Sequence, residues 1–215
     1  IVITMSWGKS MWGGKEAIKI PETQNLKLIH LPGAGLDAIN FSQLPDKCKV
    51  CNVYEHEIPM AEYCIGNILY WEMELLRKVI KFKSLDWSDC MIFDGSTHSE
   101  LYNKSLAIIG YGKIGKEIAK RIKPFGVQVT SYTRVKQKKD RYLTNVYLSS
   151  QLKKNIHKFD YIIIACPLTN KTENLINKDI IKKMKKTAVI INVARGGIVN
   201  EKDLYYALKR KQIAG

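Results

Sequence analysis

A chain of 215 residues, 46% of them hydrophobic, is long enough to bury a substantial core in one large domain or two small ones. Its apolar runs fall short of the roughly 20 residues that span a bilayer, and five cysteines, an odd number scattered through apolar segments, argue against a secreted disulfide framework. The short apolar runs and the cysteines therefore predict a cytoplasmic protein with no membrane partner. The net charge of +15 is spread over the chain without a basic stripe interleaved with aromatic residues, so we expect no nucleic-acid partner.

The first part of the chain, residues 1–57, alternates short apolar runs with turn-rich stretches and predicts a small α/β unit. Strands are expected in the apolar runs at residues 1–4, 27–31 and 49–53. Cys48 and Cys51 form a CxxC pair, but no second pair or histidine stands at ligand spacing. We interpret the pair as part of a half-buried strand and expect no metal site.

A long helix is predicted next over residues 58–81, where apolar residues recur at helical spacing along a broad face. We expect the segment 58–83 to be a hinge helix that links two units. The stretch up to residue 104 is polar and irregular.

Strands and helices alternate strictly in the remainder of the chain. The predicted elements cover residues 106–109, 113–123, 128–132, 161–166, 178–184, 188–193 and 201–211. Strict alternation predicts an α/β fold with a doubly wound parallel sheet over residues 84–215. The chain starts without Met and stops directly after a helical pattern, so we expect a fragment truncated at both ends, with this domain C-terminally incomplete.

The turn after the first of these strands has GxGxxG spacing, formed by Gly110, Gly112 and Gly115. Gly110 permits a tight turn, Gly112 lets the backbone approach a pyrophosphate, and Gly115 lets the following helix pack closely on the sheet. The amides at a helix N-terminus attract phosphate groups. Because a strand precedes the turn and a helix follows it, the motif predicts a dinucleotide site.

A second candidate site follows the strand expected at 188–193, which ends in Ala194, Arg195, Gly196 and Gly197. Ligands bind at the carboxyl ends of strands in such sheets. A guanidinium can hold a carboxylate and polarise a neighbouring carbonyl oxygen, which the reduction of a 2-oxo acid requires. The alternative is an arginine that holds a structural carboxylate.

Together these motifs resemble the NAD-binding domain of the D-isomer-specific 2-hydroxyacid dehydrogenases, and the resemblance covers nearly the whole chain. Besides the glycine turn it rests on KLIHLPGAGLDAINF (27–41), EIPMAEYCIGNIL (57–69), YIIIACPLTNKTENLI (161–176) and INVARGG (191–197). It implies a Rossmann-type dinucleotide domain, part of a smaller flavodoxin-like substrate domain, and hydride transfer between a nicotinamide cofactor and a small 2-oxo or 2-hydroxy acid. It also implies a homodimer.

The resemblance implies roles for individual residues. Arg195 would be the catalytic residue that clamps the substrate, and Ala34 and Gly35 would offer backbone amides to the substrate carboxylate. The cofactor-binding positions would be Gly110, Gly112, Lys113, Ile114 and Gly115 at the pyrophosphate, Thr133 and Arg134 at the end of the second strand, Cys166, Pro167 and Thr172 on the adenosine side, and Val193, Ala194 and Arg195 on the nicotinamide side.

One departure from the family pattern concerns the choice between NAD and NADP. NAD-specific members carry an acidic residue about 20 positions after the glycines, which binds the adenosine ribose, and here Thr133 stands at that position. Arg134 and further cations follow, so we expect NADP to be mildly favoured over NAD. The alternative is that a lysine-rich chain places cations on every loop.

A second departure concerns the proton donor, which in the family is a His paired with a Glu beyond the last residue of this chain. Of the chain's four histidines, His56 between two glutamates is the most suggestive, and we interpret it as a surface or hinge residue. We therefore expect these 215 residues to bind cofactor with little or no turnover. Two other classes stay open, a non-catalytic redox sensor or scaffold of the same fold and a basic nucleic-acid-binding module.

Overall fold

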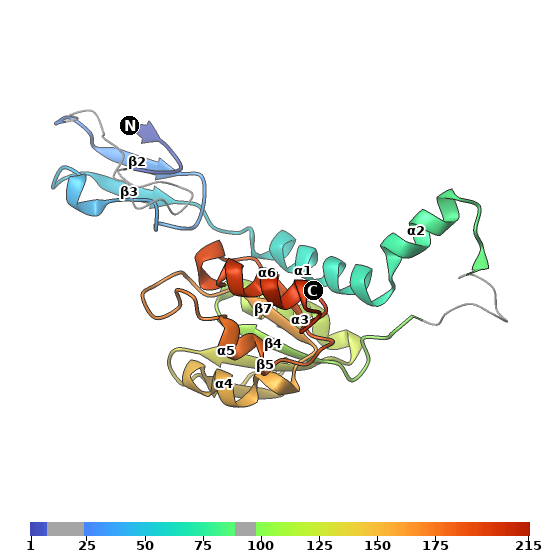
Figure 1. The fold of residues 1–215 in the computed structure, drawn as a ribbon. Helices are drawn as coiled ribbons and strands as arrows, with labels where there is room; N and C mark the ends of the chain where they lie inside the picture. The colour runs from blue at the N-terminus through green and yellow to red at the C-terminus, as the bar shows by residue number, and fades with distance from the viewer. Residues whose placement is uncertain (8–23, 89–97) are drawn as a thin grey trace. The chain divides into compact units, whose positions relative to one another are not determined.

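The computed structural model describes residues 1–7, 24–88 and 98–215 (Figure 1). The chain forms two compact units, Ile1–His56 and Glu57–Gly215. Of the polar stretch expected up to residue 104, residues 89–97 lie outside the described part. None of the helices in the described ranges has both the length and the apolar character needed to cross a membrane.

The first unit is built on a parallel sheet of three strands in the order β1-β2-β3. The strands are β1 (Val2–Ile3), β2 (Leu28–Leu31) and β3 (Lys49–Asn52), and the 3-10 turn η1 covers Phe41–Gln43. Ile29 and Leu31 of β2 are buried against Ile39, which forms the core of this unit. All of the strands expected here are confirmed, and in β3, which carries Cys51, exposed and half-buried residues alternate as interpreted from the sequence.

The second unit is built on a parallel sheet of five strands in the order β6-β5-β4-β7-β8. The strands are β4 (Ser105–Ile109), β5 (Gln128–Thr133), β6 (Asn145–Leu148), β7 (Tyr161–Ile164) and β8 (Val189–Asn192). Strand β4 lies in the middle of this sheet. The next two strands, β5 and β6, lie on one side of it, and β7 and β8 lie on the other. The predicted doubly wound parallel sheet is therefore confirmed, whereas the edge strand β6 was not predicted.

Helices cover both faces of this sheet (Figure 1). The α-helices are α1 (Glu57–Glu72), α2 (Leu75–Lys83), α3 (Lys113–Ile122), α4 (Leu152–Asn155), α5 (Lys178–Ile181) and α6 (Glu201–Lys209), and the 3-10 turns are η3 (Lys123–Phe125), η4 (Ser149–Gln151), η5 (Ile156–Lys158) and η6 (Gly196–Ile198). Leu106 and Ile108 of β4 pack with α1 and α3 on one face. Ala107 and Ile109 pack with α4, α5 and α6 on the other. Successive side chains of a strand point to opposite faces, so β4 is apolar on both.

The single helix predicted over residues 58–81 is wrong, because two helices occupy this range. Glu74 lies between them in the left-handed conformation, with φ of 50°. The apolar side of α1, which includes Cys64 and Ile68, is buried where the helix packs against α3. No residue of α2 is buried by the described part of the chain. The buried apolar side of α1 therefore does not continue into α2.

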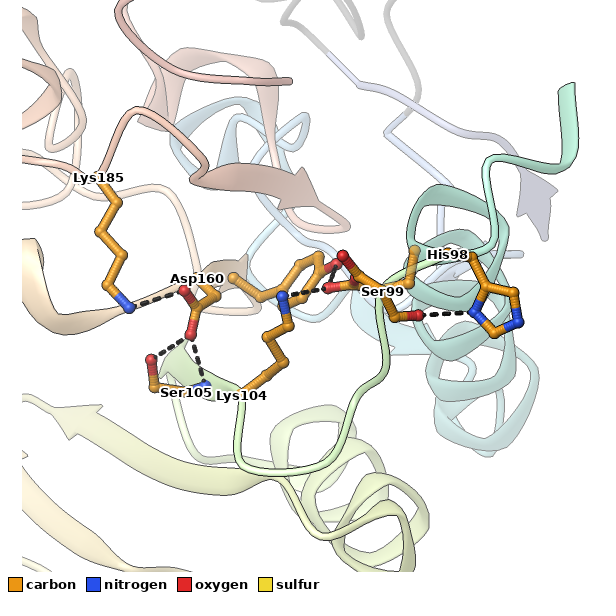
Figure 2. A network of polar contacts seen from close by, with 8 residues as sticks. His98, Ser99, Lys104, Ser105, Asp160 and Lys185 are labelled. Atoms are coloured by element: carbon orange, nitrogen blue, oxygen red, sulfur yellow. Dashed lines mark hydrogen bonds and ion pairs between the residues drawn. The ribbon is translucent and has the colours of Figure 1, made fainter. Parts of the chain in front are cut away.

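Polar side chains fix the amino-terminal edge of the five-stranded sheet, and Figure 2 shows Asp160 between Ser105 and Lys185. The Asp160 carboxylate accepts hydrogen bonds from the amide of Ser105 at 2.9 Å, from its hydroxyl at 2.7 Å and from Lys185 Nζ at 2.7 Å. Nearby, the hydroxyl of Tyr161 donates to Glu72 Oε1 at 2.5 Å, and Lys104 Nζ lies 3.3 Å from the same oxygen. These contacts join the starts of β4 and β7 to the end of α1.

Candidate active site

The glycine turn leaves the carboxyl end of β4 and leads directly into α3. Gly110 has φ of 99°, a conformation that favours glycine. Its amide donates to the carbonyl of Tyr132 in β5 at 2.9 Å. A Cβ at Gly110 would lie 2.7 Å from the Cα of Cys166, so a side chain would push apart the turn and the loop after β7.

Gly112 and Gly115 differ in their surroundings. A Cβ at Gly115 would collide with the carbonyl oxygen of Gly110, whereas a Cβ at Gly112 would meet no described atom within 4 Å. The space in front of Gly112 is therefore open to a ligand. Because the first amides of a helix point out of its N-terminus, those of Lys113 and Ile114 face this end of α3, where an anion is favoured. This cradle fits a diphosphate group.

The loop after β7 carries the residues expected on the adenosine side. Thr172 Oγ1 donates to the carbonyl of Pro167 at 2.7 Å and accepts from the amide of Thr169 at 2.8 Å, which closes the loop into a compact turn. Cys166 lies against the glycine turn through its contact with Gly110. Burial raises the pKa of the Cys166 thiol, so this side chain is uncharged at physiological pH.

The arginine turn follows β8. Asn192 shapes it, because its side-chain oxygen accepts from the amide of Ala194 at 3.0 Å and its side-chain nitrogen donates to the carbonyl of Arg195 at 2.9 Å. The Arg195 guanidinium is exposed and donates to the carbonyl of Ala194 at 3.1 Å. Val193 precedes the turn, and its amide donates to the carbonyl of Ile164 in β7 at 3.1 Å.

The loop after β7 and the arginine turn are fastened to each other. The amide of Asn174 donates to the carbonyl of Gly197 at 2.9 Å, and the amide of Ile176 donates to the carbonyl of Ile198 at 3.1 Å. A Cβ at Gly197 would lie 3.4 Å from the side chain of Leu168. Because the loop also contacts Gly110, it links the glycine turn to the arginine turn along one edge of the sheet.

The end of β5 carries the residues expected near the adenosine ribose. Thr133 is buried, and its hydroxyl donates to the carbonyl of Val135 at 2.7 Å, so it turns the chain out of the strand. The next six residues, 134–139, are all exposed and include Arg134, Lys136, Lys138 and Lys139. We call residues 134–139 the basic segment.

The residues expected to bind the substrate carboxylate lie in the first unit, directly after β2. The carbonyl of Ala34 accepts a hydrogen bond from the Asn52 side chain at 2.9 Å, and Gly35 is half-buried. Their role in binding the substrate carboxylate stays a prediction. His56 is the last residue of the first unit, and its interpretation as a surface or hinge residue also stays a prediction.

Two positioning features of the site were missed. Asn192 had a recognisable signal, since an asparagine at the end of a strand is typical of a turn that its own side chain closes. The hydrogen bond from the Tyr111 hydroxyl to Asp140 Oδ2, at 2.8 Å, joins residues 29 positions apart. No local pattern predicts such a contact.

Comparison with known proteins gives a family match for most of the chain. A family model described as the NAD-binding domain of D-isomer specific 2-hydroxyacid dehydrogenases matches residues 70–215. The human glyoxylate reductase/hydroxypyruvate reductase is 42% identical over 204 residues, which cover 88% of this chain and 58% of the human protein. The D-3-phosphoglycerate dehydrogenase of Methanocaldococcus jannaschii is 34% identical over 196 residues, which cover 90% of this chain and 37% of that protein.

Solved structures give the same result. A D-lactate dehydrogenase from Aquifex aeolicus, solved with NAD and lactic acid, has a TM-score of 0.78 at 30% identity and covers 88% of this chain and 56% of its own. A D-isomer specific 2-hydroxyacid dehydrogenase family protein from Aeromonas salmonicida has a TM-score of 0.79 at 27% identity. The match covers 88% of this chain and 59% of the Aeromonas chain. The chain thus spans 37 to 59% of the length of these relatives.

Proposed function

The chain belongs to the D-isomer specific 2-hydroxyacid dehydrogenase family, and on that premise we propose that its protein transfers a hydride between a nicotinamide cofactor and a small 2-oxo or 2-hydroxy acid. The observation that carries the proposal is the parallel sheet, in which the Gly110 turn after β4 and the Arg195 turn after β8 share the carboxyl edge. One edge can therefore serve both the diphosphate and the reacting end of an extended dinucleotide.

The residues at this edge of the sheet are proposed to have separate roles in binding the cofactor and the substrate. The cradle of Gly110, Gly112 and the amides of Lys113 and Ile114 would hold the diphosphate, and the bound nicotinamide would supply or accept the hydride. Arg195 would hold the substrate carboxylate and stabilise negative charge on the substrate oxygen as it develops. Asn192 would keep the arginine turn in place through its two hydrogen bonds.

Glyoxylate and hydroxypyruvate are the substrates that we propose to test first. Relatives named hydroxypyruvate reductase, from Thermotoga maritima, and glyoxylate reductase/hydroxypyruvate reductase, from human, both cover most of this chain. Both acids have a carboxylate beside a carbonyl group, which is the arrangement that the planar fork of Arg195 can hold.

The experiment is the oxidation of reduced cofactor by the intact protein in the presence of each acid. Arg195→Lys keeps the charge but loses the fork, so we expect kcat/KM for the acid to fall by about 10²-fold or more. The Kd of the reduced cofactor should change by less than about threefold, because this arginine acts on the substrate. Arg210→Lys, at the exposed residue that follows α6, is the control. An unchanged kcat/KM in Arg195→Lys would contradict the proposal.

We further propose that the site prefers NADP to NAD. The acidic residue that would repel a 2′-phosphate is replaced by Thr133, and exposed cations of the basic segment follow it. Fluorescence titration of NADPH against NADH tests this preference. Equal dissociation constants would contradict it.

The protein is also proposed to be a homodimer. Helix α2 lies within the matched domain and exposes a row of apolar side chains, namely Leu75, Leu76, Val79, Ile80 and Phe82. An apolar surface of this kind on one element is typical of an interface. A second copy of the same surface is a suitable partner, because apolar side chains pack against each other in a self-complementary contact.

We also propose that the protein is cytoplasmic. The cysteines in the described ranges, Cys48, Cys51, Cys64 and Cys166, are all free thiols. Thiols persist in a reducing compartment. Localisation of a tagged protein by fluorescence microscopy tests this assignment, and a signal confined to an oxidising compartment would contradict it.

A further inference from the structure

Tyr111 stands between the first two glycines of the turn, Gly110 and Gly112. Only 5% of it is exposed, and its ring belongs to the same buried cluster as Leu143, which follows the basic segment. Its hydroxyl donates to Asp140 Oδ2 at 2.8 Å. A residue of the glycine turn is therefore bonded to the chain that follows β5.

Asp140 closes the basic segment at its far end. Its other carboxylate oxygen accepts from the amide of Tyr142 at 2.9 Å, which turns the chain toward β6. At the near end, Thr133 donates to the carbonyl of Val135 at 2.7 Å. The exposed residues 134–139 are thus anchored at both ends, and the far anchor depends on Tyr111.

The bond between Tyr111 and Asp140 is of a strong kind, because its acceptor is a carboxylate. Burial raises the pKa of the Tyr111 hydroxyl, and the hydrogen bond to Asp140 raises it further. The hydroxyl therefore stays protonated and remains a donor across the physiological range. The ring packing and the hydrogen bond together fix Asp140 relative to the glycine turn.

We propose that Tyr111 is a positioning residue for cofactor selectivity. Through Asp140 it holds the basic segment at a set distance from the glycine turn, so that Arg134 and its neighbours meet the 2′-phosphate while the turn holds the diphosphate of the same molecule. This inference rests on the proposed preference for NADP. Its physical basis is preorganisation, because a segment that is already ordered loses less conformational entropy when the phosphate binds.

The test compares fluorescence titrations of NADPH and NADH in the wild-type protein and in Tyr111→Phe, which keeps the ring and removes only the donor. We expect the Kd of NADPH to rise about fivefold and that of NADH less than about twofold, because NADH makes no use of the basic segment. In an Arg134→Ala background, Tyr111→Phe should change both constants by the same factor. If Tyr111 acts by positioning Arg134, its effect on the ratio of the two constants disappears once Arg134 is removed. A general effect on stability would not depend on Arg134.

Tyr161→Phe is the matched control, since it removes another buried tyrosine–carboxylate hydrogen bond, to Glu72 at 2.5 Å, at the opposite edge of the sheet. It should lower the melting temperature and leave the ratio of the two constants unchanged. As a second measurement, hydrogen exchange of residues 134–139 in the cofactor-free protein should be faster in Tyr111→Phe than in Tyr161→Phe.

The possible outcomes distinguish a failure of the role proposed for Tyr111 from a failure of the proposed preference for NADP. A wild-type protein that binds NADH as tightly as NADPH overturns the preference for NADP, and the inference with it. A wild-type protein that prefers NADPH while Tyr111→Phe keeps the same ratio overturns the inference alone. Unchanged exchange of residues 134–139 in Tyr111→Phe also overturns it.

Discussion

At the scale of single residues, Gly112 and Gly115 offer a pair of substitutions with different expected results. Gly115→Ala would place a methyl group against the carbonyl of Gly110, so we expect a loss of about 1–3 kcal/mol of stability together with weaker cofactor binding. Gly112→Ala meets no described atom within 4 Å, so the fold should keep its melting temperature. Its methyl group would occupy the ligand's space, and cofactor affinity should fall by about tenfold or more.

Thermal unfolding and cofactor titration of the two variants check this pair. We expect Gly112→Ala to weaken cofactor binding without lowering the melting temperature, and Gly115→Ala to lower both. Normal cofactor affinity in Gly112→Ala would show that the diphosphate does not lie over this turn.

The residues of the site differ in how far the sequence could predict them. The glycine turn and Arg195 could be placed at the ends of strands because a local pattern, an apolar run followed by a turn, marks each of them. The anchoring of Asp140 by Tyr111 could not, because it depends on how β4 and the chain after β5 meet in three dimensions. Thr133 was expected at the end of the second strand near the cofactor, and the structure adds that its hydroxyl donates to the carbonyl of Val135.

At the scale of elements, the Asp160 contacts join β4, β7 and the turn before β8. Burial is the largest influence on the pKa of this carboxyl and raises it, but the hydrogen bonds from Lys185 and Ser105 outweigh it, so the folded-state pKa lies below the ordinary value. A carboxyl of this kind contributes stability above its unfolded pKa of about 3.9, and that contribution is lost as the pH falls through the folded value.

We therefore expect Asp160→Asn to lower the free energy of unfolding at pH 7 by about 1–3 kcal/mol. The difference from the wild-type protein should shrink as the pH drops below about 4, since the wild-type carboxyl becomes protonated there. Asp179→Asn is the control, because Asp179 pairs with Lys153 at the surface and should contribute less than about 1 kcal/mol. Urea unfolding across the pH range checks this, and a constant difference down to pH 2 would speak against the assignment.

Two features of the secondary structure, the break between α1 and α2 and strand β6, were not predicted because their sequences lack the usual signals. The break at Glu74 lacks the glycine or proline that normally marks the end of a helix, and the apolar spacing continues across it. Strand β6 is short, and its residues are only half-buried or exposed, so Asn145–Leu148 lacks the apolar run that identified β4 and β7. The central strands were predicted because they are buried on both faces and therefore apolar throughout.

At the scale of the whole molecule, the exposed apolar side of α2 bears on assembly. Leu76 is 57% exposed and Ile80 is 56% exposed, and their spacing of four residues places them on the same side of the helix. Replacing both by Asp should convert the proposed dimer into monomers, because a charged pair cannot be buried in an apolar contact without a large cost.

Sedimentation velocity of the wild-type and doubly substituted proteins checks the assembly. Lys154→Asp, at an exposed position of α4, introduces a charge elsewhere and should leave the dimer intact. A wild-type protein that sediments as a monomer at micromolar concentration would contradict the proposed homodimer.

A crystal structure of the protein with NADPH bound would show directly where the cofactor lies. We expect the diphosphate within hydrogen-bonding distance of the amides of Lys113 and Ile114, and the nicotinamide ring beside the turn that carries Arg195. A cofactor bound elsewhere, or one whose nicotinamide points away from the carboxyl end of β8, would contradict this expectation.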